Sequence, residues 1–320
     1  MLDVTERVTF LVRAFGESHT SRDGVNVYFK CPSCGKKPEK KKLVVRIDTE
    51  KWHCWVCDIK GGTVGGLLRR YSPSLLPEWN KRFGTHGRSS FDDDLVEIKE
   101  RIEFPEMHSI DALRGMIDPD AKAILSYLKK RGVSYETAYR FRLCGSIRGA
   151  SRRRVVFPSF DSEGVPNYWT ARSVDSDSRL RYLNPKADRR GIVFNEIDVD
   201  WDKELVVVEG PFDMLNAGEN AVPLLGSALS TESLLFRRIV ENSTPIVLAL
   251  DNDMRKKSHD IAKKLYSYDV KVRILDTGST KDVGDMPREE FLENLHNAKE
   301  WSPDDRLSFL IKRISSGSII

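Results

Sequence analysis

The chain has 320 residues, of which 40% are hydrophobic and 31% are charged. This length allows two or three domains of roughly 100 to 200 residues, and the composition is typical of a folded globular protein. No stretch approaches the roughly 18 consecutive apolar residues of a membrane-spanning helix, and the N-terminus MLDVTERVTF lacks the basic and apolar regions of a secretory signal. We therefore expect a cytoplasmic protein without membrane association.

The net charge is only +4, but it is unevenly distributed. Residues 140–190 contain twelve Lys and Arg against five Asp and Glu, whereas residues 196–260 contain six against thirteen. A basic segment followed by an acidic one is typical of a polyanion-binding surface next to a cation-binding centre. Two solvated faces of opposite charge explain the same distribution equally well.

Residues 1–76 are predicted to form a zinc ribbon that binds DNA. Two CxxC pairs, Cys31 with Cys34 and Cys54 with Cys57, flank nineteen residues that can form a hairpin. Four thiolates in this pattern complete a closed tetrahedral site for structural zinc. His53 is an alternative ligand, and the fifth cysteine, Cys144, is predicted to be a small core residue.

The same region mixes aromatic and basic residues. These are Tyr28, Phe29, Trp52 and Trp55 with Lys30, Lys36, Lys37, Lys40, Lys41, Lys42 and Lys51. The mixture suits base stacking beside phosphate binding, although a domain this small also needs aromatic residues for packing. A polar linker, which has room for a helix of its own, is expected over residues 77–110.

The chain after the linker predicts a basic subdomain over residues 111–195. Residues 118–133 have the apolar spacing and charged ends of a capped amphipathic helix, and a second short helix follows at 134–143. The segments RRRVVFPSF and VPNYWTARS, joined by the turn DSEG, predict an antiparallel hairpin.

From residue 196 the pattern changes to continuous apolar runs that alternate with amphipathic helices. The runs include ELVVVEG, PIVLALDND and VKVRILD. Runs that are apolar on both faces are typical of a parallel sheet covered by helices. We therefore predict an α/β fold with a central, mainly parallel sheet over residues 196–288 and a helical tail over 289–320.

Three predicted strands end in carboxylates. Glu209 follows the first, with Asp213 one helical turn later; Asp251 and Asp253 follow the second; Asp282 and Asp285 follow the third. Side chains at the carboxyl ends of parallel strands meet at one edge of the sheet. Carboxylates held together repel one another unless a hard divalent cation such as Mg²⁺ or Mn²⁺ binds them, so the pattern predicts a phosphoryl-transfer centre.

In this order, the motifs resemble those of the bacterial DnaG-type primases and the related primases of tailed bacteriophages. The cysteine ribbon is similar to the family's zinc-binding domain. The segment AILSYLKKRGVSYETAYRFRL resembles the opening of its RNA polymerase domain, and RRVVFPSFDSEGVPNYWTARSV and RYLNP resemble its template-contacting stretch. The segments VVVEGPFD, LALDND and KDVGDM resemble the three acidic motifs of its TOPRIM sheet. TOPRIM motifs alone also occur in topoisomerases and nucleases.

The resemblance implies roles for particular residues. Glu209, Asp251 and Asp253 are expected as catalytic metal ligands, with Asp213 and Asp282 in support. The residues expected to hold template or nucleotide are Arg154, Arg172, Arg181, Asn184, Lys186 and Arg189.

Three departures from the family pattern are visible. The second acidic motif reads DND where DGD is common, Pro211 and Phe212 stand where Gly-Tyr is usual, and the ribbon has four cysteines where many members have three and a histidine. About 35 residues follow the last acidic motif, fewer than a helicase-binding domain needs, which favours a primase of a phage or mobile element.

The expected function is therefore synthesis of short RNA primers on single-stranded DNA by magnesium-dependent nucleotidyl transfer from ribonucleoside triphosphates. A replicative helicase is the expected protein partner. Two alternatives remain, a metal-dependent TOPRIM nuclease and a non-catalytic replisome protein that binds single-stranded DNA.

Overall fold

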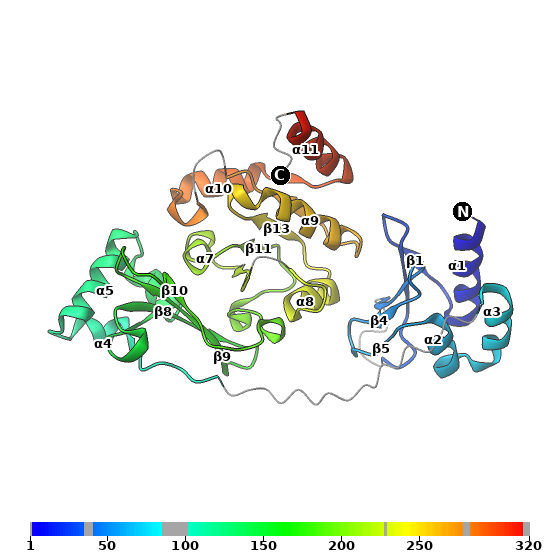
Figure 1. Ribbon diagram of the computed structural model, residues 1–320, viewed down its shortest axis with the longest axis horizontal. Coiled ribbons are helices and arrows are strands. Elements are labelled where there is room, and N and C mark those ends of the chain that lie inside the picture. Colours follow the sequence, from blue (N-terminus) through cyan, green and yellow to red (C-terminus); the bar gives the residue numbers. More distant parts are fainter. Residues whose placement is uncertain (1, 35–40, 85–101, 227–228, 278–281, 316–320) are drawn as a thin grey trace. The chain divides into compact units, whose positions relative to one another are not determined.

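The computed structural model describes residues 2–34, 41–84, 102–226, 229–277 and 282–315 (Figure 1). The chain packs into two compact units. The first contains residues 1–97, 239–243 and 263–271, and the second contains residues 98–238, 244–262 and 272–320. No helix in the described ranges combines the length and the apolar character needed to cross a bilayer.

The first unit is built on an antiparallel sheet in the strand order β1-β2-β3-β4-β5. The strands are β1 (His19–Thr20), β2 (Asn26–Phe29), β3 (Leu43–Arg46), β4 (Trp52–Cys54) and β5 (Lys60–Gly61), and the helices are α1 (Leu2–Phe15), α2 (Val64–Tyr71) and α3 (Leu76–Phe83), with the turn η1 (Pro73–Leu75) before α3. Strands β2 and β3 pair antiparallel, with Val27 opposite Val45. Thr63 caps α2, since its side chain accepts a hydrogen bond from the backbone N–H of Gly66.

Helix α1 was absent from the sequence prediction, whereas α3 lies in the predicted linker, which had room for a helix. Phe10 of α1 packs edge-on against Trp79 of α3 with the ring centroids 5.3 Å apart. Trp79 is almost fully buried. The segment predicted as a linker over 77–110 thus begins with a helix that belongs to this core, while residues 85–101 lie outside the described ranges.

The second unit contains an antiparallel sheet in the order β10-β9-β8-β7-β6. Its strands are β6 (His108–Ser109), β7 (Cys144–Ser146), β8 (Arg154–Phe160), β9 (Pro166–Ser173) and β10 (Tyr182–Leu183), and the accompanying helices are α4 (Ile110–Arg114), α5 (Pro119–Lys130) and α6 (Tyr135–Arg140). The predicted hairpin is therefore confirmed as β8 and β9. A side chain at Gly145 of β7 would meet Leu113 of α4 at 2.5 Å, so glycine permits this close packing.

The sequence of α5 contains both an N-terminal cap and a buried apolar face. The carboxylate of Asp118 caps it by accepting from the backbone N–H groups of Asp120 and Ala121, at 2.7 and 3.4 Å. Ala121, Ile124 and Leu128 recur at helical spacing and are buried.

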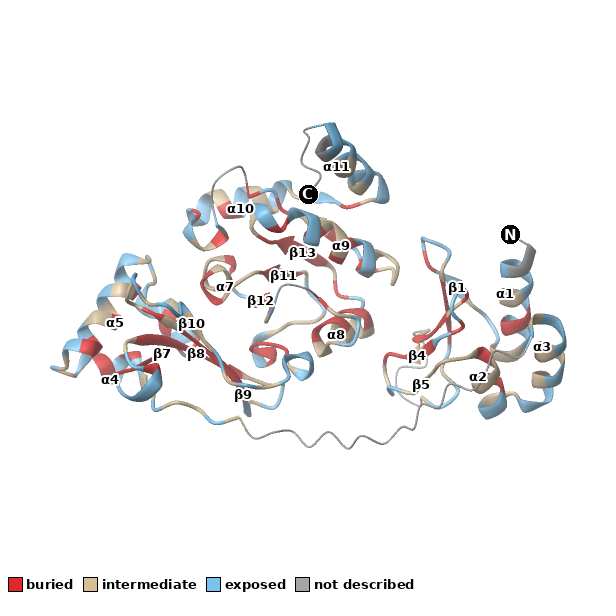
Figure 2. Ribbon diagram, in the orientation of Figure 1, coloured by how far each residue is buried: buried red, intermediate tan, exposed pale blue. Residues whose placement is uncertain are grey.

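The second unit also contains a sheet in the order β12-β11-β13-β14-β15, parallel except for the last pair. Its strands are β11 (Leu205–Val208), β12 (Ala221–Pro223), β13 (Ile246–Ala249), β14 (Val272–Ile274) and β15 (Lys299–Glu300), and its helices are α7 (Pro211–Ala217), α8 (Leu234–Asn242), α9 (Arg255–Tyr266), α10 (Arg288–Asn297) and α11 (Pro303–Ser315). Every residue of β11 and β13 is buried, as Figure 2 shows. The predicted α/β class with a mainly parallel sheet is confirmed.

The two sheets of the second unit share one hydrophobic core. Phe157 of β8 packs edge-on against Phe212 of α7, with the ring centroids 5.0 Å apart. This packing fixes the basic segment of the chain against the acidic one. The finer subdivision at residues 111–195, 196–288 and 289–320 stays a prediction.

Candidate active site

Three carboxylates meet where strands β11 and β13 end. The two strands are parallel neighbours, with Val208 opposite Ala249, so the residues that follow them emerge at the same edge. Glu209 follows β11, Asp251 follows β13, and Asp253 lies in the short turn η5 (Asn252–Met254). One oxygen from each of the three lies within 4.8 Å of the other two. The three residues expected as principal metal ligands are thus brought together.

The carboxylates of this cluster raise one another's pKa values. Burial raises the pKa of Asp251 to about 6, with further contributions from the charges of Asp282, Glu209 and Asp253. Burial also raises the pKa of Glu209, as do the charges of Asp253 and Asp213. The Oδ1 atom of Asp251 is buried and has no hydrogen-bond partner among the described residues. A group of hard oxygen donors with an unsatisfied buried oxygen fits a divalent cation such as Mg²⁺ or Mn²⁺.

Asp213 supports the cluster through the backbone. Its Oδ2 accepts from the N–H of Gly210 at 2.7 Å, and its Oδ1 accepts from the N–H of Gly284 at 2.9 Å. Burial raises its pKa to about 6. Asp213 therefore links the start of α7 to the turn η6 (Val283–Asp285). Its oxygens do not belong to the group of Glu209, Asp251 and Asp253 oxygens that lie within 4.8 Å of one another.

Asp282 directly precedes η6 and is exposed. Its charge is the largest charge contribution to the raised pKa of Asp251, and the backbone of the next residue, Val283, hydrogen-bonds the Asp251 carboxylate. Asp282 thus lies in reach of the cluster electrostatically without being one of its three close members.

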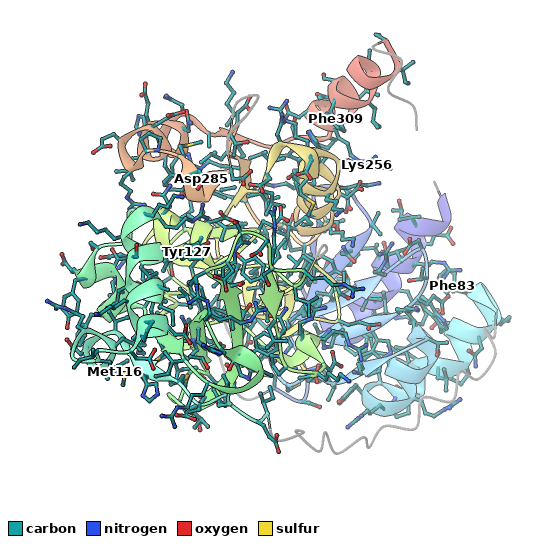
Figure 3. All side chains as sticks on the ribbon, turned by 60° about the vertical axis from the view of Figure 1, so that its left-hand side comes forward. Phe83, Met116, Tyr127, Lys256, Asp285 and Phe309 are labelled. Atoms are coloured by element: carbon teal, nitrogen blue, oxygen red, sulfur yellow. The ribbon has the colours of Figure 1, made fainter. Side chains whose placement is uncertain are left out.

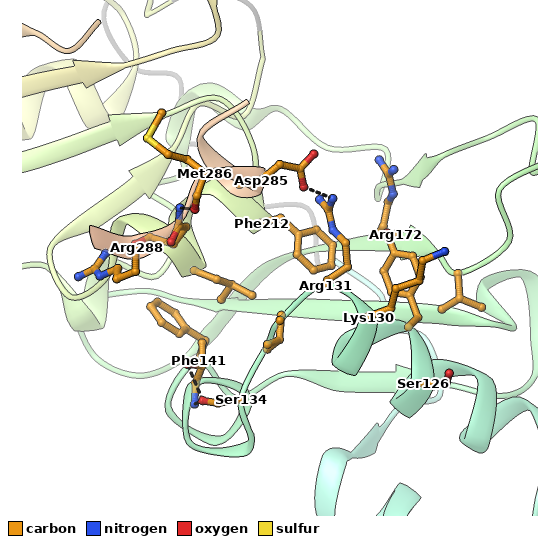
Figure 4. Close-up of a pocket in the computed structure, with 18 of the residues that line it drawn as sticks. Ser126, Lys130, Arg131, Ser134, Phe141, Arg172, Phe212, Asp285, Met286 and Arg288 are labelled. Carbon is orange, nitrogen blue, oxygen red and sulfur yellow. Dashed lines mark hydrogen bonds and ion pairs between the residues drawn. The ribbon is translucent and has the colours of Figure 1, made fainter. Parts of the chain in front are cut away.

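A cavity of about 1370 Å³ lies beside this cluster in the second unit. It is lined by α5, α6, the end of β9, the β9–β10 loop, α7 and η6 (Figure 4). Asp213 of α7 and the Val283 backbone of η6 also interact with Glu209 and Asp251, so both elements border the acidic cluster as well. The basic residues in its wall are Lys130, Arg131, Arg140, Arg153, Arg172, Arg181 and Arg288, and the acidic ones are Glu136, Asp175, Glu219 and Asp285. Figure 3 shows the side chains around it, with Tyr127 of α5 and Asp285 of η6 labelled. The excess of positive charge suits a polyanion.

Two of the basic residues expected to bind template or nucleotide line this cavity. Arg172 of β9 lies with its guanidinium carbon 4.8 Å from the centroid of the Tyr182 ring. Arg181 precedes β10 and is exposed. The other expected residues Asn184, Lys186 and Arg189 are exposed but do not line the cavity.

Arg154 requires a correction. Its side chain is buried, and its guanidinium donates to the backbone carbonyls of Leu180 at 2.9 Å, Arg181 at 3.3 Å and Ala171 at 3.4 Å. These bonds hold the loop that carries Arg181 against strand β9. Arg154 therefore positions this loop and does not face solvent, where a template strand would contact it.

Arg131 was not singled out from the sequence. It follows α5 directly, pairs with the Asp285 carboxylate, and lies with its guanidinium carbon 4.7 Å from the centroid of the Phe212 ring. The basic run Lys129, Lys130, Arg131 was interpreted only as the end of a helix. Nothing local in the sequence distinguishes a helix-terminating arginine from one that reaches across to a neighbouring subdomain.

The cysteine cluster of the first unit is a separate site. The sulfur atoms of Cys31, Cys54 and Cys57 lie within 4.8 Å of one another, with Cys31 and Cys57 3.7 Å apart. Burial raises the pKa of Cys54. Burial also opposes ionisation of Cys57, but hydrogen bonds from the backbone of Ile59 and from the other three thiols, Cys34 among them, outweigh it and lower the pKa of Cys57. Such thiols form a soft donor set of the kind that zinc prefers.

The two other residues weighed from the sequence lie outside this cluster. His53 pairs through its Nε2 with Asp58 at 2.7 Å and does not belong to the close sulfur group. Cys144 lies on β7 and packs beside Val156, Trp169 and Ala171, and burial raises its pKa to about 11.

Two DNA primases are similar to this chain in sequence. No protein-family model matches the chain. The DNA primase of Listeria innocua is 23% identical over 293 residues, which are 72% of this chain and 46% of that protein. The DNA primase of Mycoplasma genitalium is 25% identical over 195 residues, which are 58% of this chain and 29% of that protein. The chain therefore spans less than half the length of these two relatives.

Two further similarities differ in extent. Allograft inflammatory factor 1 of Macaca mulatta is 30% identical over 103 residues, which are 32% of this chain and 69% of that protein. This stretch is too short to include both the cysteine cluster and Asp251. The crystal structure of the Aquifex aeolicus primase, with its zinc-binding and RNA polymerase domains, covers 93% of this chain and 84% of that chain with 18% identity and a TM-score of 0.47.

Proposed function

We propose that the chain is a primase of the DnaG type, as the order of its motifs predicts and its similarity to two DNA primases supports, and that it synthesises short RNA primers on single-stranded DNA. The observation that carries this proposal is the position of the acidic cluster. Glu209, Asp251 and Asp253 gather at the sheet edge beside a large basic cavity that shares α7 and η6 with them. Nucleotidyl transfer needs both features, a cation centre for the reacting phosphate and a basic surface for the nucleic acid.

The cavity residues bind and orient the polyanions in this proposal. Arg172 and Arg181 hold phosphates of the template or of the incoming ribonucleoside triphosphate, because their side chains line the cavity and no acidic partner is seen for either among the described contacts. Arg154 keeps the loop of Arg181 in place. Holding two reactants in one geometry supplies a large part of the acceleration in such reactions.

The carboxylates Glu209, Asp251 and Asp253 hold the divalent cation, with Asp282 adding negative charge beside them. When bound, Mg²⁺ or Mn²⁺ acts as a Lewis acid that favours the deprotonated 3′-hydroxyl and offsets the charge of the departing pyrophosphate. Asp213 holds the start of α7 next to η6, because its carboxylate accepts hydrogen bonds from the backbone N–H groups of Gly210 and Gly284. The protein itself supplies positioning and charge neutralisation and forms no covalent bond to substrate.

The cysteine cluster is proposed to bind one structural zinc ion, with Cys31, Cys34, Cys54 and Cys57 as ligands. Four protein thiolates leave no open coordination position, so zinc here stabilises the first unit and does not take part in the chemistry. The expected role of this unit is contact with the DNA template. A replicative helicase partner, a cytoplasmic location and a phage or mobile-element source also stay predictions.

A primer-synthesis assay on a mixed-sequence single-stranded template tests the function. With labelled ribonucleotides and Mg²⁺ we expect short RNA products, and we expect Asp253→Asn to lower their yield by about a hundredfold or more. Asp260→Asn is the matched control, because Asp260 lies on α9 and pairs with Arg306. Near-normal synthesis by Asp253→Asn would overturn the proposal.

The same incubation separates the alternatives. If labelled DNA strands are shortened by a metal-dependent reaction and no RNA appears, the chain is a nuclease of the TOPRIM type. If DNA is bound in a salt-sensitive way but neither product appears, the chain is a binding protein. The raised pKa of Asp251 and its unsatisfied oxygen favour a cation-dependent reaction over simple binding.

A further inference from the structure

Helix α6 exposes two aromatic rings on one side. Tyr135 and Tyr139 stand one helical turn apart, with their ring centroids 6.5 Å apart and their planes inclined by 30°. Tyr139 is 71% exposed and Tyr135 is 45% exposed, whereas Ala138 is the buried residue of this helix. The two rings therefore do not contribute to the core.

The neighbouring charged groups orient Tyr135. The guanidinium carbon of Arg114, at the end of α4, lies 4.9 Å from the centroid of its ring. The carboxylate of Asp111 hydrogen-bonds its hydroxyl group. Two exposed tyrosine rings with an arginine beside one of them are a combination that sequence-tolerant binders of single strands use, because every base has a face that can stack and every nucleotide has a phosphate.

The same helix forms part of the wall of the basic cavity. Glu136 and Thr137, which lie between the two tyrosines in the sequence, and Arg140, which follows Tyr139, line the cavity. A strand that lies in the cavity and passes out over α6 would meet the tyrosine rings next. The basic residues Lys129 and Lys130 close α5 just before this helix begins, which adds to the positive charge at that end of the cavity.

An alternative role for the rings is local helix stabilisation. Aromatic pairs at this spacing contribute only about 0.2 to 0.5 kcal/mol to a helix. Leucine at both positions would provide the same apolar contact with no flat ring. Stabilisation of α6 therefore does not explain why both positions carry a flat aromatic ring.

We propose that Tyr135 and Tyr139 form a stacking platform for bases of the single-stranded DNA that leaves or enters the basic cavity. This rests on the proposed function in naming DNA as the partner. The rings contribute contact with bases, whereas the cavity arginines contribute contact with phosphates.

Binding of a short fluorescent oligothymidylate, followed by anisotropy in EDTA, tests the platform without any reaction. Replacing both tyrosines with leucine is expected to weaken binding by about tenfold, and replacing both with phenylalanine is expected to leave it unchanged. An abasic oligonucleotide of the same length is expected to bind all three proteins equally, because it carries the phosphates without the bases. Ile311→Ala, at a residue of α11 that is 54% exposed, is the control for loss of an exposed apolar side chain.

Thermal melting of each variant establishes that the fold is retained. The slope of affinity against salt concentration is expected to stay constant in the leucine variant, because no phosphate contact is removed. Photo-crosslinking from a bromouracil-substituted strand gives a direct readout, with adducts expected on Tyr135 or Tyr139. The platform is wrong if the leucine variant binds the oligothymidylate as tightly as wild type, or if abasic and base-bearing strands lose affinity equally.

The binding test of the tyrosine platform and the primer-synthesis assay can fail independently of each other. A chain that makes no primers but loses base-dependent affinity in the leucine variant has the platform without the polymerase. A chain that makes primers, and in which the leucine variant needs no more template for half-maximal synthesis, has the polymerase without the platform.

Discussion

The guanidinium of Arg131, at the end of α5, pairs with the carboxylate of Asp285 in η6. This contact joins the antiparallel sheet region to the loop that follows β14. The same loop donates the backbone N–H of Gly284 to Asp213, and the backbone of Val283 hydrogen-bonds Asp251. The ion pair thus holds a residue that directly follows Gly284 and Val283, whose backbones hydrogen-bond Asp213 and Asp251.

Asp285→Asn is expected to weaken Mn²⁺ binding at the acidic cluster by about tenfold, because loss of groups that orient metal ligands costs on this scale. Global stability should change by less than about 1 kcal/mol, since both partners are partly exposed. Mn²⁺ affinity by calorimetry and the unfolding free energy in urea measure the two quantities.

Glu219→Gln is the control for this effect. Glu219 pairs with Arg140 in the wall of the same cavity at 2.6 Å and makes no contact with η6 in the described hydrogen bonds. If both variants weaken Mn²⁺ binding equally, the effect comes from cavity charge and not from the position of η6.

Asp251→Asn is expected to stabilise the metal-free protein while removing activity. The raised pKa of Asp251 measures the cost of its negative charge in the cluster, and asparagine removes that charge while keeping an oxygen for the Val283 backbone. The raised pKa of Asp251, discounted for the partial exposure of this side chain, corresponds to a gain of about 1 kcal/mol in the free energy of unfolding. Urea unfolding in EDTA at pH 8 measures the gain, and unchanged or lower stability would contradict the strain argument.

The stability difference between Asp251→Asn and wild type should depend on pH. The carboxyl of Asp251 has a folded-state pKa of about 6, above the value of about 3.9 in an unfolded chain. A raised pKa contributes stability that is complete below about pH 4 and is lost as the pH rises through about 6. The variant and wild type should therefore be equally stable near pH 4 and differ most above pH 7, in metal-free buffer.

Divalent cations should reverse this trend for wild type. Protons and Mn²⁺ compete for the same carboxylates, so stabilisation by Mn²⁺ should be full above about pH 7 and should fade as the pH drops through about 6. Melting temperature with and without Mn²⁺ across this range provides the measurement. A Mn²⁺ effect that is as large at pH 5 as at pH 8 would place the cation elsewhere.

The parallel sheet and its acidic edge were predictable from the sequence. Strands β11 and β13 are buried on both faces, so every position is apolar, and the first polar residue after each strand marks the sheet edge. Chain order and the parallel rule then bring Glu209 and Asp251 together. The meeting of Glu209 and Asp251 depends only on these two strands being parallel neighbours.

Residues whose roles depend on loops were not predictable in this way. Arg154 begins a strand in a basic segment, and its sequence context is the same whether its side chain faces solvent or turns inward. The fold of the loop around residues 180 and 181 presents carbonyl oxygens that draw the guanidinium inside. Arg131 and the tyrosines of α6 share this limitation, since their neighbours come from α4, α7 and η6.

Helix α1 was missed for a related reason. Phe10 and Leu11 are buried, and Val8, Ala14 and Phe15 pack beside them, but about half of the described helix is exposed. It is held by packing against Trp79 in a segment predicted as a linker. Helices α1 and α3 thus bury each other's aromatic side chains, a contact between distant segments that the sequence does not show locally.

Cys57→Ser is expected to lower the zinc content from about one ion per chain to well below it, because a four-thiolate site has no spare ligand. Cys57 is a strong choice, since backbone and thiol hydrogen bonds lower its pKa and favour the thiolate that a metal needs. Zinc released by acid into a chromogenic chelator measures the content. Cys144→Ser is the matched control, because Cys144 packs on β7 in the second unit, and it should retain full zinc.

Hydrogen exchange of backbone amides measures which strands the zinc ion stabilises. In the Cys57→Ser protein, amides of β2, β3 and β4 should lose protection, because a structural zinc contributes directly to the folding free energy of the part that binds it. Amides of β11 and β13 should keep their protection, since these strands belong to the core of the second unit. If Cys57→Ser keeps its zinc, or if β11 and β13 open together with the first sheet, the cysteine cluster is not a structural zinc site confined to the first unit.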